Sequence, residues 1–120
     1  MSAVDLLAPP DPATVANAVA LFAAAIRKEY GNCIKGVYLF GSRARGDFDP
    51  YSDADIAIIL DDSIGRTSQT KPLAEIAYDI FLRTGTEIQP WVFPEAEWSN
   101  PQHSSAAGLI RAVRRDGLPF

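Results

Sequence analysis

Apolar side chains recur along the first third of the chain at the spacing of a helix. Between residues 12 and 30 they return every three or four positions, which is the repeat of one buried helix face. The apolar positions are Val15, Val19, Phe22 and Ile26. Asp11 before Pro12 is typical of a helix start, because aspartate accepts hydrogen bonds at the N-cap and proline suits the first helical position. Gly31 is typical of a helix end.

The same pattern predicts two further helices. Residues 71–85 carry an early proline, Pro72, then an apolar stripe and a closing glycine. The stripe consists of Leu73, Ile76, Ile80 and Phe81. Residues 104–117 predict a shorter last helix that ends at Gly117. Its apolar side carries Leu109, Ile110 and Val113. The polar residues 61–70 predict a loop.

Three apolar runs without helical spacing predict strands at residues 34–40, 54–60 and 86–93. The middle run is almost entirely apolar, which is typical of a strand buried on both faces at the centre of a sheet. Pro90 interrupts the last run and predicts an edge strand or a bulge, because proline cannot donate to a sheet. The order helix, strand, strand, helix, strand, helix predicts a small α/β (α+β) domain in which helices flank a mixed sheet.

Length and composition exclude several classes of protein. The 120 residues, of which 48% are hydrophobic, suit a single domain over residues 1–120, with residues 1–10 expected to form a mobile leader. The net charge of −4 argues against general nucleic-acid binding, which usually needs a basic surface. No apolar run approaches a membrane span, and the N-terminus lacks the features of a secretory signal. We therefore expect a cytoplasmic protein with no membrane partner.

The chain has one cysteine, Cys33, and one histidine, His103. Cys33 has no partner for an internal disulfide, which suits a reducing compartment. A zinc site built on histidine is not expected from a single imidazole.

Two carboxylates, Asp53 and Asp55, stand at the head of the central predicted strand. Alternate residues of a strand point to the same face, so the two side chains project together. Two ionised carboxylates this close repel each other unless a cation lies between them. Mg²⁺ suits the pair because it takes oxygen ligands and keeps water and phosphate as its other partners, and Mn²⁺ fits the same ligands. Taken alone, an Asp-x-Asp pair also fits two solvated loop residues.

A glycine and a serine, Gly41 and Ser42, end the strand before this pair. Glycine lets a ligand approach the backbone closely, and the Ser42 hydroxyl can cap a short helix or turn through the following "RARG". Backbone N–H groups at such a terminus favour phosphate, and Arg43 and Arg45 are near enough to add charge-assisted bonds. If the two strands are neighbours, this turn and the carboxylates together would hold a nucleoside triphosphate with its Mg²⁺. An ordinary turn with solvated arginines is the alternative.

Gly41-Ser42, ten intervening residues and Asp53-x-Asp55 together resemble the signature of the nucleotidyltransferase superfamily related to DNA polymerase β. The segments "FGSRARG" and "SDADIAI" are most similar to its minimal nucleotidyltransferase (MNT) branch, and the resemblance covers about half of the chain. It implies the polymerase β-like nucleotidyltransferase fold, nucleotide binding at Gly41, Ser42 and Arg43, and two Mg²⁺ ions on the catalytic pair Asp53 and Asp55. It also implies transfer of a nucleoside monophosphate, AMP from ATP or its equivalent from another triphosphate, to a hydroxyl group with release of pyrophosphate.

One position departs from the family's pattern. The family usually carries a third acid on a later strand, where it helps to activate the attacking hydroxyl. In "TEIQPWVF" the alignment places Gln89 there, while Glu87 lies on the same face two residues earlier and can substitute if the register shifts. With Gln89 at this position one metal would bind more weakly, and catalysis would be slow or lost. In a regular strand, Trp91 lies on the same face as Glu87 and Gln89. Its side chain would either pack against the domain or form part of a partner surface.

The resemblance also implies a protein partner. MNT proteins are often antitoxins paired with a HEPN-type RNase toxin, and some inactivate it by adding AMP to a tyrosine. The leading hypothesis is therefore an antitoxin that modifies its cognate HEPN toxin. The second is an antitoxin of the same fold that blocks its partner by binding alone. The third is a small-molecule transferase of the aminoglycoside-modifying kind, for which a homodimer would supply the missing second wall of the pocket.

Overall fold

The computed structural model describes residues 5–120, without the side chains of residues 66 and 67. Its elements are α1 (Pro12–Tyr30), η1 (Gly31–Cys33), β1 (Ile34–Phe40), α2 (Ser42–Arg45), β2 (Ala54–Leu60), α3 (Arg66–Thr84), β3 (Ile88–Pro94), α4 (Glu95–Ser99), η2 (Pro101–His103), α5 (Ala107–Asp116) and β4 (Leu118–Pro119). The expected α/β class, with a mixed sheet and flanking helices, is confirmed. Of the expected leader, residues 1–4 lie outside the described part, and residues 5–9 are exposed.

The four strands form one sheet in the order β3-β2-β1-β4, so the apolar strand β2 lies in the interior as predicted. β2 runs antiparallel to β1 and parallel to β3. β3 is an edge strand, which confirms the expectation from Pro90. The short β4 pairs with the far side of β1. The last residues of β1 therefore lie beside the first residues of β2, which in turn lie beside the first residues of β3.

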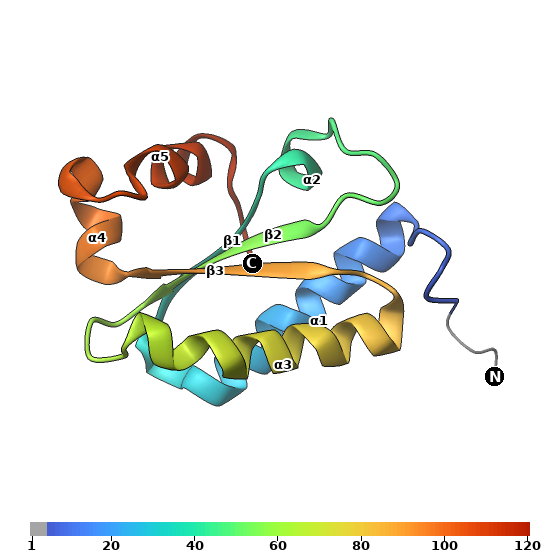
Figure 1. Cartoon of the computed structure of the whole chain (residues 1–120), viewed down its shortest axis with the longest axis horizontal. Helices are drawn as coiled ribbons and strands as arrows, with labels where there is room; N and C mark the ends of the chain where they lie inside the picture. The colour runs from blue at the N-terminus through green and yellow to red at the C-terminus, as the bar shows by residue number, and fades with distance from the viewer. Residues whose placement is uncertain (1–4) are drawn as a thin grey trace.

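Helices cover the two faces of the sheet to different extents (Figure 1). α1 and α3 lie along one face, where Ile56 and Ile58 of β2 join the larger hydrophobic core. On the other face α4 and α5 cover one end only, and there Ala57 and Ile59 pack with Ile110 of α5. The short helix α2 lies towards the opposite end of that face (Figure 1). The end nearest α2 therefore has room for polar side chains.

Helix α1 begins and ends as predicted. The Asp11 carboxylate accepts the Thr14 N–H at 2.7 Å, and Pro12 is the first helical residue. Gly31 closes the helix with φ 54°, a conformation that favours glycine. The four predicted positions of the apolar stripe, Val15, Val19, Phe22 and Ile26, are all buried.

The sequence predicted a loop over residues 61–70, and this prediction is wrong for residues 66–70, which are helical. α3 begins at Arg66 with Gly65 as its N-cap, so Pro72 lies inside the helix rather than at its start. The Ser68 hydroxyl donates to the Gly65 carbonyl at 2.7 Å in this first turn. Because Ser68 and Thr70 are exposed, the extra turns carry no apolar repeat for a sequence pattern to detect.

The elements α4, η2 and β4 were not predicted, because five residues or fewer are too short to show a periodicity. Within the described part of the chain, no helix is long and apolar enough to cross a membrane.

Candidate functional site

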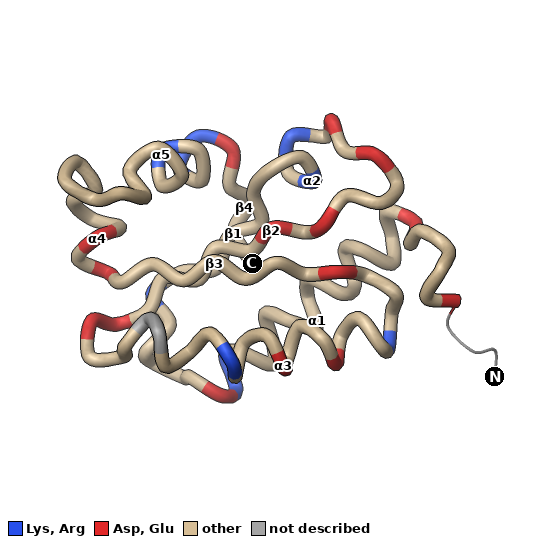
Figure 2. The backbone as a smooth tube through the Cα atoms, in the orientation of Figure 1, with Lys and Arg blue, Asp and Glu red and all other residues tan. Residues whose placement is uncertain are grey.

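The two carboxylates predicted from the sequence, Asp53 and Asp55, lie on the sheet face that α5 packs against. They are at the end of that face that α5 leaves uncovered. Asp55 is the second residue of β2, paired with Phe40 of β1 on one side and with Gln89 of β3 on the other. Asp53 immediately precedes β2. Strand alternation places both side chains on the face of Ala57 and Ile59. Figure 2 shows acidic residues together at this end of β2 and at the start of β3, with the basic residues of α2 nearby.

Gly41 and Asp55 approach each other more closely than a larger residue at position 41 would allow. Gly41 has φ 74°, and a methyl group on its Cα would lie 2.5 Å from Oδ2 of Asp55. Real Cβ atoms do not come this close to an oxygen, so a larger residue would have to displace the Asp55 carboxylate, and the backbone conformation also favours glycine. The turn and the carboxylate pair, separate motifs in the sequence, therefore meet at this contact.

A short helix follows Gly41, as expected from "RARG". Gly41 is its N-cap, Ser42 is its first residue, and no side chain makes a capping hydrogen bond, so the expected capping by the Ser42 hydroxyl is wrong. The Ala44 and Arg45 N–H groups donate to the Gly41 carbonyl, each at 3.1 Å. The first N–H groups of a helix have no acceptor within it, so those of Ser42 and Arg43 remain for another partner.

The structure does not bring the Arg43 side chain to the carboxylates. Arg43 is only 8% exposed, and its guanidinium donates to the carbonyls of Ser52 and Pro50 at 3.1 and 3.2 Å. It also lies over the Phe48 ring, 4.3 Å from the centroid. The guanidinium is thus bonded within its own loop, and the backbone N–H is the part of Arg43 that faces no acceptor in the helix. The guanidinium instead shapes the loop that leads into Asp53.

Arg45 is the arginine whose charge reaches the site. It is exposed and lies 3.2 Å from Asp47 and 3.8 Å from Asp116. Its positive charge also lowers the pKa of Asp55, although this is the smallest of four effects on that carboxyl. Arg45 is thus better placed than the Arg43 side chain for a phosphate at the carboxylates.

Trp91 is part of the site and was not assigned a role there from the sequence. Its indole Nε1 donates to Oδ1 of Asp55 at 3.1 Å, and its ring packs edge-on against Phe40 with centroids 6.3 Å apart. The pKa of Asp55 is raised, mainly by burial and further by repulsion from Asp53, while the Trp91 hydrogen bond opposes the rise. The two-residue spacing from Gln89 to Trp91 predicted that these side chains share one face of the strand. The hydrogen bond from Trp91 to Asp55 could not be predicted, because it depends on the register of β2 and β3.

Both candidates for the third position lie on the same side of the carboxylate pair. Gln89 stands opposite Asp55 in the parallel register. One step earlier, the Ala54 N–H donates to the Glu87 carbonyl at 2.9 Å, which places Glu87 beside Asp53. A hydrogen bond with the Asp53 side chain, followed by repulsion between the two charges, raises the pKa of Glu87. Glu87 is therefore harder to ionise beside Asp53 than it would be in water.

The chemistry of these side chains fits a hard divalent cation. Asp53 and Asp55 offer oxygen ligands on one face. The pKa of Asp55 is raised, mainly because burial disfavours its charged form and also because of repulsion from Asp53, and a cation at the pair would offset both effects. Across residues 5–120, no group of three or more histidine, cysteine or acidic side chains is gathered tightly enough to hold a metal by itself. Such a pair would leave water and phosphate to complete the coordination of Mg²⁺, which that ion prefers.

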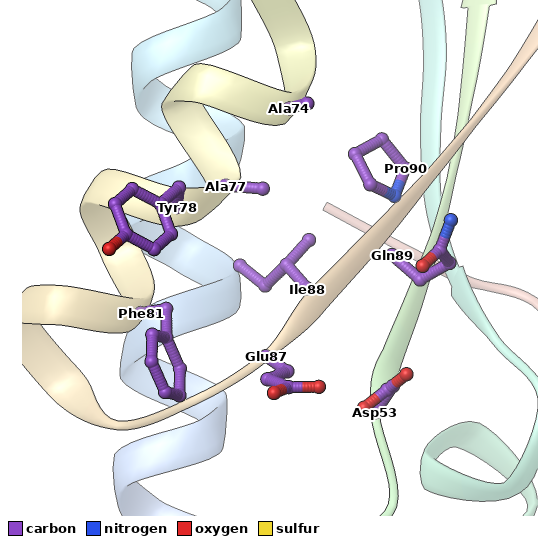
Figure 3. A pocket seen from close by; sticks show the side chains of 9 residues that line it. All are labelled: Asp53, Ala74, Ala77, Tyr78, Phe81, Glu87, Ile88, Gln89 and Pro90. Carbon is purple, nitrogen blue, oxygen red and sulfur yellow. The ribbon is translucent and has the colours of Figure 1, made fainter. Parts of the chain in front are cut away.

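A cavity of about 310 Å³ opens between α3 and β3 beside these carboxylates. Figure 3 shows the Glu87 and Asp53 carboxylates next to each other at one end of it. Side chains of α3, including Tyr78 and Phe81, form the opposite wall. The site thus has a turn with free N–H groups on the β1 side and an open hollow on the β3 side.

One family of known proteins matches most of this chain. A family model described as a nucleotidyltransferase domain matches residues 20–108. Among curated proteins, none matches the chain.

Several solved structures share the fold at low sequence identity. A toxin–antitoxin structure with AMP-PNP is 18% identical, with a TM-score of 0.56 over 82% of this chain and 68% of that chain. A structure of the toxin–antitoxin MntA–HpeT, in which two aspartates two positions apart are replaced by glutamate, is 16% identical, with a TM-score of 0.55 over 81% and 68%. A putative nucleotidyltransferase from Sulfolobus solfataricus is 20% identical, with a TM-score of 0.50 over 90% and 83%.

Proposed function

Because the chain belongs to the family of nucleotidyltransferase domains, we propose that it is a Mg²⁺-dependent enzyme that transfers AMP from ATP to a hydroxyl group. The observation that carries this proposal is the contact between Gly41 and Asp55. It joins the turn after β1 to the acidic pair of β2, so that a phosphate chain on the turn lies within reach of a metal on the carboxylates. We also propose that residues 1–120 act as a single domain.

Each part of the site has a role in this proposal. Asp53 and Asp55 hold the divalent metal, and the free N–H groups of Ser42 and Arg43 bind the phosphate chain together with the Arg45 side chain. Mg²⁺, when bound, neutralises phosphate charge and stabilises the attacking and leaving oxygens. Asp55 stays oriented through its hydrogen bond from Trp91.

The proposed reaction is a displacement at the α-phosphorus of ATP. The acceptor oxygen forms a bond to that phosphorus, and the bond from the phosphorus to the oxygen bridging it to the β-phosphate breaks. Pyrophosphate leaves with the electron pair of that bond, and the acceptor carries AMP. The hydroxyl proton passes to Glu87, whose carboxylate lies next to Asp53.

We further propose that the acceptor is a cognate toxin protein of the HEPN type and that the chain acts as its antitoxin. Two structures of similar fold are toxin–antitoxin structures, and one of them contains AMP-PNP. In the other, the two replaced aspartates have the spacing of Asp53 and Asp55. These likenesses support both the partner and the importance of the acidic pair.

A second function, an antitoxin that blocks its partner by binding alone, is favoured by one observation. Gln89 stands opposite Asp55, and an amide there supplies no third negative charge for a second metal. The fold would then serve as a scaffold for the partner, and the nucleotide site would contribute little.

The test is to isolate the tagged protein gently from its source cell and to record the intact mass of the protein that accompanies it. The isolation is repeated with Asp53→Asn and with the control Asp79→Asn, on the exposed side of α3. We expect the partner to carry the mass of AMP with the unsubstituted protein and with Asp79→Asn, but not with Asp53→Asn. A partner that remains unmodified in all three isolations would contradict the enzyme and support the binding function.

A further inference from the structure

The C-terminal end of α5 reaches the turn to which the proposed function assigns phosphate binding. The strand β4 follows α5 directly and pairs antiparallel with β1, with Leu118 opposite Leu39. Followed back by two residues, this antiparallel course brings Asp116, the last residue of α5, towards Gly41. Figure 2 shows the charged end of α5 next to the basic residues of α2. The turn therefore lies between β2 on one side and the end of α5 on the other.

Four charged side chains alternate in sign across this junction. The guanidinium of Arg45, the last residue of α2, lies 3.2 Å from Asp47 through Nε and 3.8 Å from Asp116 through Nη1. The Asp116 carboxylate in turn accepts two hydrogen bonds from Arg115, at 3.0 Å from Nε and 2.9 Å from Nη2. The contact between Arg45 and Asp116 thus joins the end of α5 to the turn.

The two carboxylates that contact Arg45 differ in their exposure to water. The Asp47 side chain is 63% exposed, whereas that of Asp116 is 14% exposed. An ion pair in water contributes little, because solvent and salt screen it. A largely covered carboxylate is screened less, and the paired bonds from Arg115 fix its orientation. Although its contact with Arg45 is longer, Asp116 is therefore the firmer anchor.

The charge of Arg115 decides how this anchor affects a bound phosphate. A lone carboxylate beside Arg45 would repel the phosphate chain. Asp116 is instead matched by Arg115, so the two together add no net charge beside the turn. What remains is the effect on orientation, because an arginine that is already held loses less rotamer freedom when it binds phosphate. The anchor therefore favours phosphate binding.

We propose that Asp116, held by Arg115, is a positioning residue that keeps the Arg45 guanidinium directed at the phosphate chain on the turn. This rests on the proposed function, in which Arg45 binds phosphate, and it extends the site to the C-terminal helix. Asp116 itself touches neither the nucleotide nor the metal. It acts through Arg45 alone, so its effect on nucleotide binding should vanish when Arg45 is replaced.

Calorimetric titration of the full chain with Mg²⁺ and α,β-methylene ATP tests the effect on binding. In this analogue carbon replaces the oxygen of the bond that would break, so no transfer occurs. The anchor variant combines Arg115→Gln with Asp116→Asn and leaves the net charge unchanged. The control variant combines Arg83→Gln with Asp79→Asn, which removes an exposed ion pair of the same 3.8 Å separation on α3. Both are also made in an Arg45→Gln background.

We expect the anchor variant to bind the analogue about three- to tenfold more weakly, the range for a side chain that must be ordered on binding. The control variant should bind it like the unsubstituted protein. In the Arg45→Gln background the anchor variant should cause no further loss. An unchanged affinity in the anchor variant, or an equal loss in that background, would overturn the role of Asp116.

The mobility of Arg45 is measured separately, without nucleotide, by the ¹⁵N–¹H heteronuclear NOE of its Nε. We expect a lower value in the anchor variant than in the unsubstituted protein and the control variant. Equal values in all three would show that Asp116 does not hold Arg45. If the unsubstituted protein fails to bind the analogue, the proposed function is contradicted together with its extension to Asp116. Normal binding with no effect of the anchor variant would overturn the role of Asp116 alone.

Discussion

The indole of Trp91 and the carboxylate of Asp55 are joined by a hydrogen bond of 3.1 Å that spans two neighbouring strands. Nε1 donates to Oδ1, so Oδ2 points to the side of Gly41. One oxygen of the carboxylate is therefore held by the protein, while the other lies where the turn and the proposed metal meet. In the proposed site, Trp91 therefore orients one of the two metal ligands.

Replacing Trp91 with phenylalanine should weaken metal binding while keeping an aromatic ring against Phe40. A hydrogen bond to a charged group contributes about 1.5–3 kcal/mol, so we expect Mg²⁺ affinity to fall by about ten- to a hundredfold. A Mn²⁺ titration followed by electron paramagnetic resonance measures this. Trp98→Phe is the control, because that ring stacks on Tyr38 at 5.5 Å. Equal affinities in the two variants would show that the indole N–H does not orient Asp55.

Gly41→Ala should disturb the site through the clash with Asp55 as well as through the backbone. Gly46 makes a matched control, since its φ of 88° is similarly unfavourable for alanine but nothing lies within 4 Å of an added methyl group. Both substitutions should destabilise the fold by about 1–3 kcal/mol through strain. Only Gly41→Ala should also reduce Mg²⁺ and ATP affinity, by about tenfold or more, in a calorimetric titration. Similar losses of affinity in both variants would mean that backbone strain, not the Asp55 contact, is responsible.

Arg43→Lys should destabilise the protein although it keeps the positive charge. A lysine cannot reproduce the fork that bonds the Ser52 and Pro50 carbonyls, nor the stacking on Phe48. We expect a loss of about 1–3 kcal/mol in the free energy of unfolding, measured by urea denaturation. Arg45→Lys, at an exposed position, should change stability by less than about 1 kcal/mol. A larger effect at Arg45 than at Arg43 would contradict the role of Arg43 in shaping the loop.

Asp55→Asn should make the metal-free protein more stable at neutral pH. The folded-state pKa of Asp55 is raised above its ordinary value of 3.8, mainly by burial, so ionisation is harder in the folded chain than in the unfolded one. Stability then falls as pH rises from below 3.8 through the raised pKa, and remains lower above it. The asparagine variant lacks this loss.

Melting temperatures in EDTA across that pH range test the sign of this effect. The advantage of Asp55→Asn should be absent at the acidic end, grow through the titration and then stay constant. Added Mg²⁺ should raise the melting temperature of the unsubstituted protein more than that of the variant. An advantage that shrinks with rising pH would show that the Asp55 carboxylate stabilises the fold instead.

Gln89→Asp should strengthen the metal site by placing a third carboxylate opposite Asp55. We expect severalfold tighter Mg²⁺ binding and faster AMP transfer, because oxygen anions are the preferred ligands of this ion. Gln89→Asn, which remains neutral, is the control, and Glu87→Gln should slow the transfer through loss of the proposed proton acceptor. A lower metal affinity in Gln89→Asp would show that residue 89 is not the third metal-binding position. Glu87 would then be the remaining candidate for it.

Features that depend only on neighbouring residues can be predicted from the amino-acid sequence. The stripe from Val15 to Ile26, the cap at Asp11 and the bounds of β1 and β2 follow from local spacing and local hydrogen bonds. The shared face of Asp53 and Asp55 follows from strand alternation, which needs no knowledge of the rest of the fold. The start of α3 is polar and β4 is very short, so neither has an apolar repeat. Because the prediction relied on such local repeats, it missed both.

Which of these features lie in contact depends on the folded sheet. The approach of Gly41 to Asp55, the bond from Trp91 and the pairing of Glu87 with Asp53 all depend on the registers of β1, β2 and β3, which are set by packing over the whole sheet. Arg43 shows the limit most clearly. Its position beside the Gly-Ser turn suggested a phosphate contact, but burial left its guanidinium needing acceptors, and the nearest were the carbonyls of its own loop.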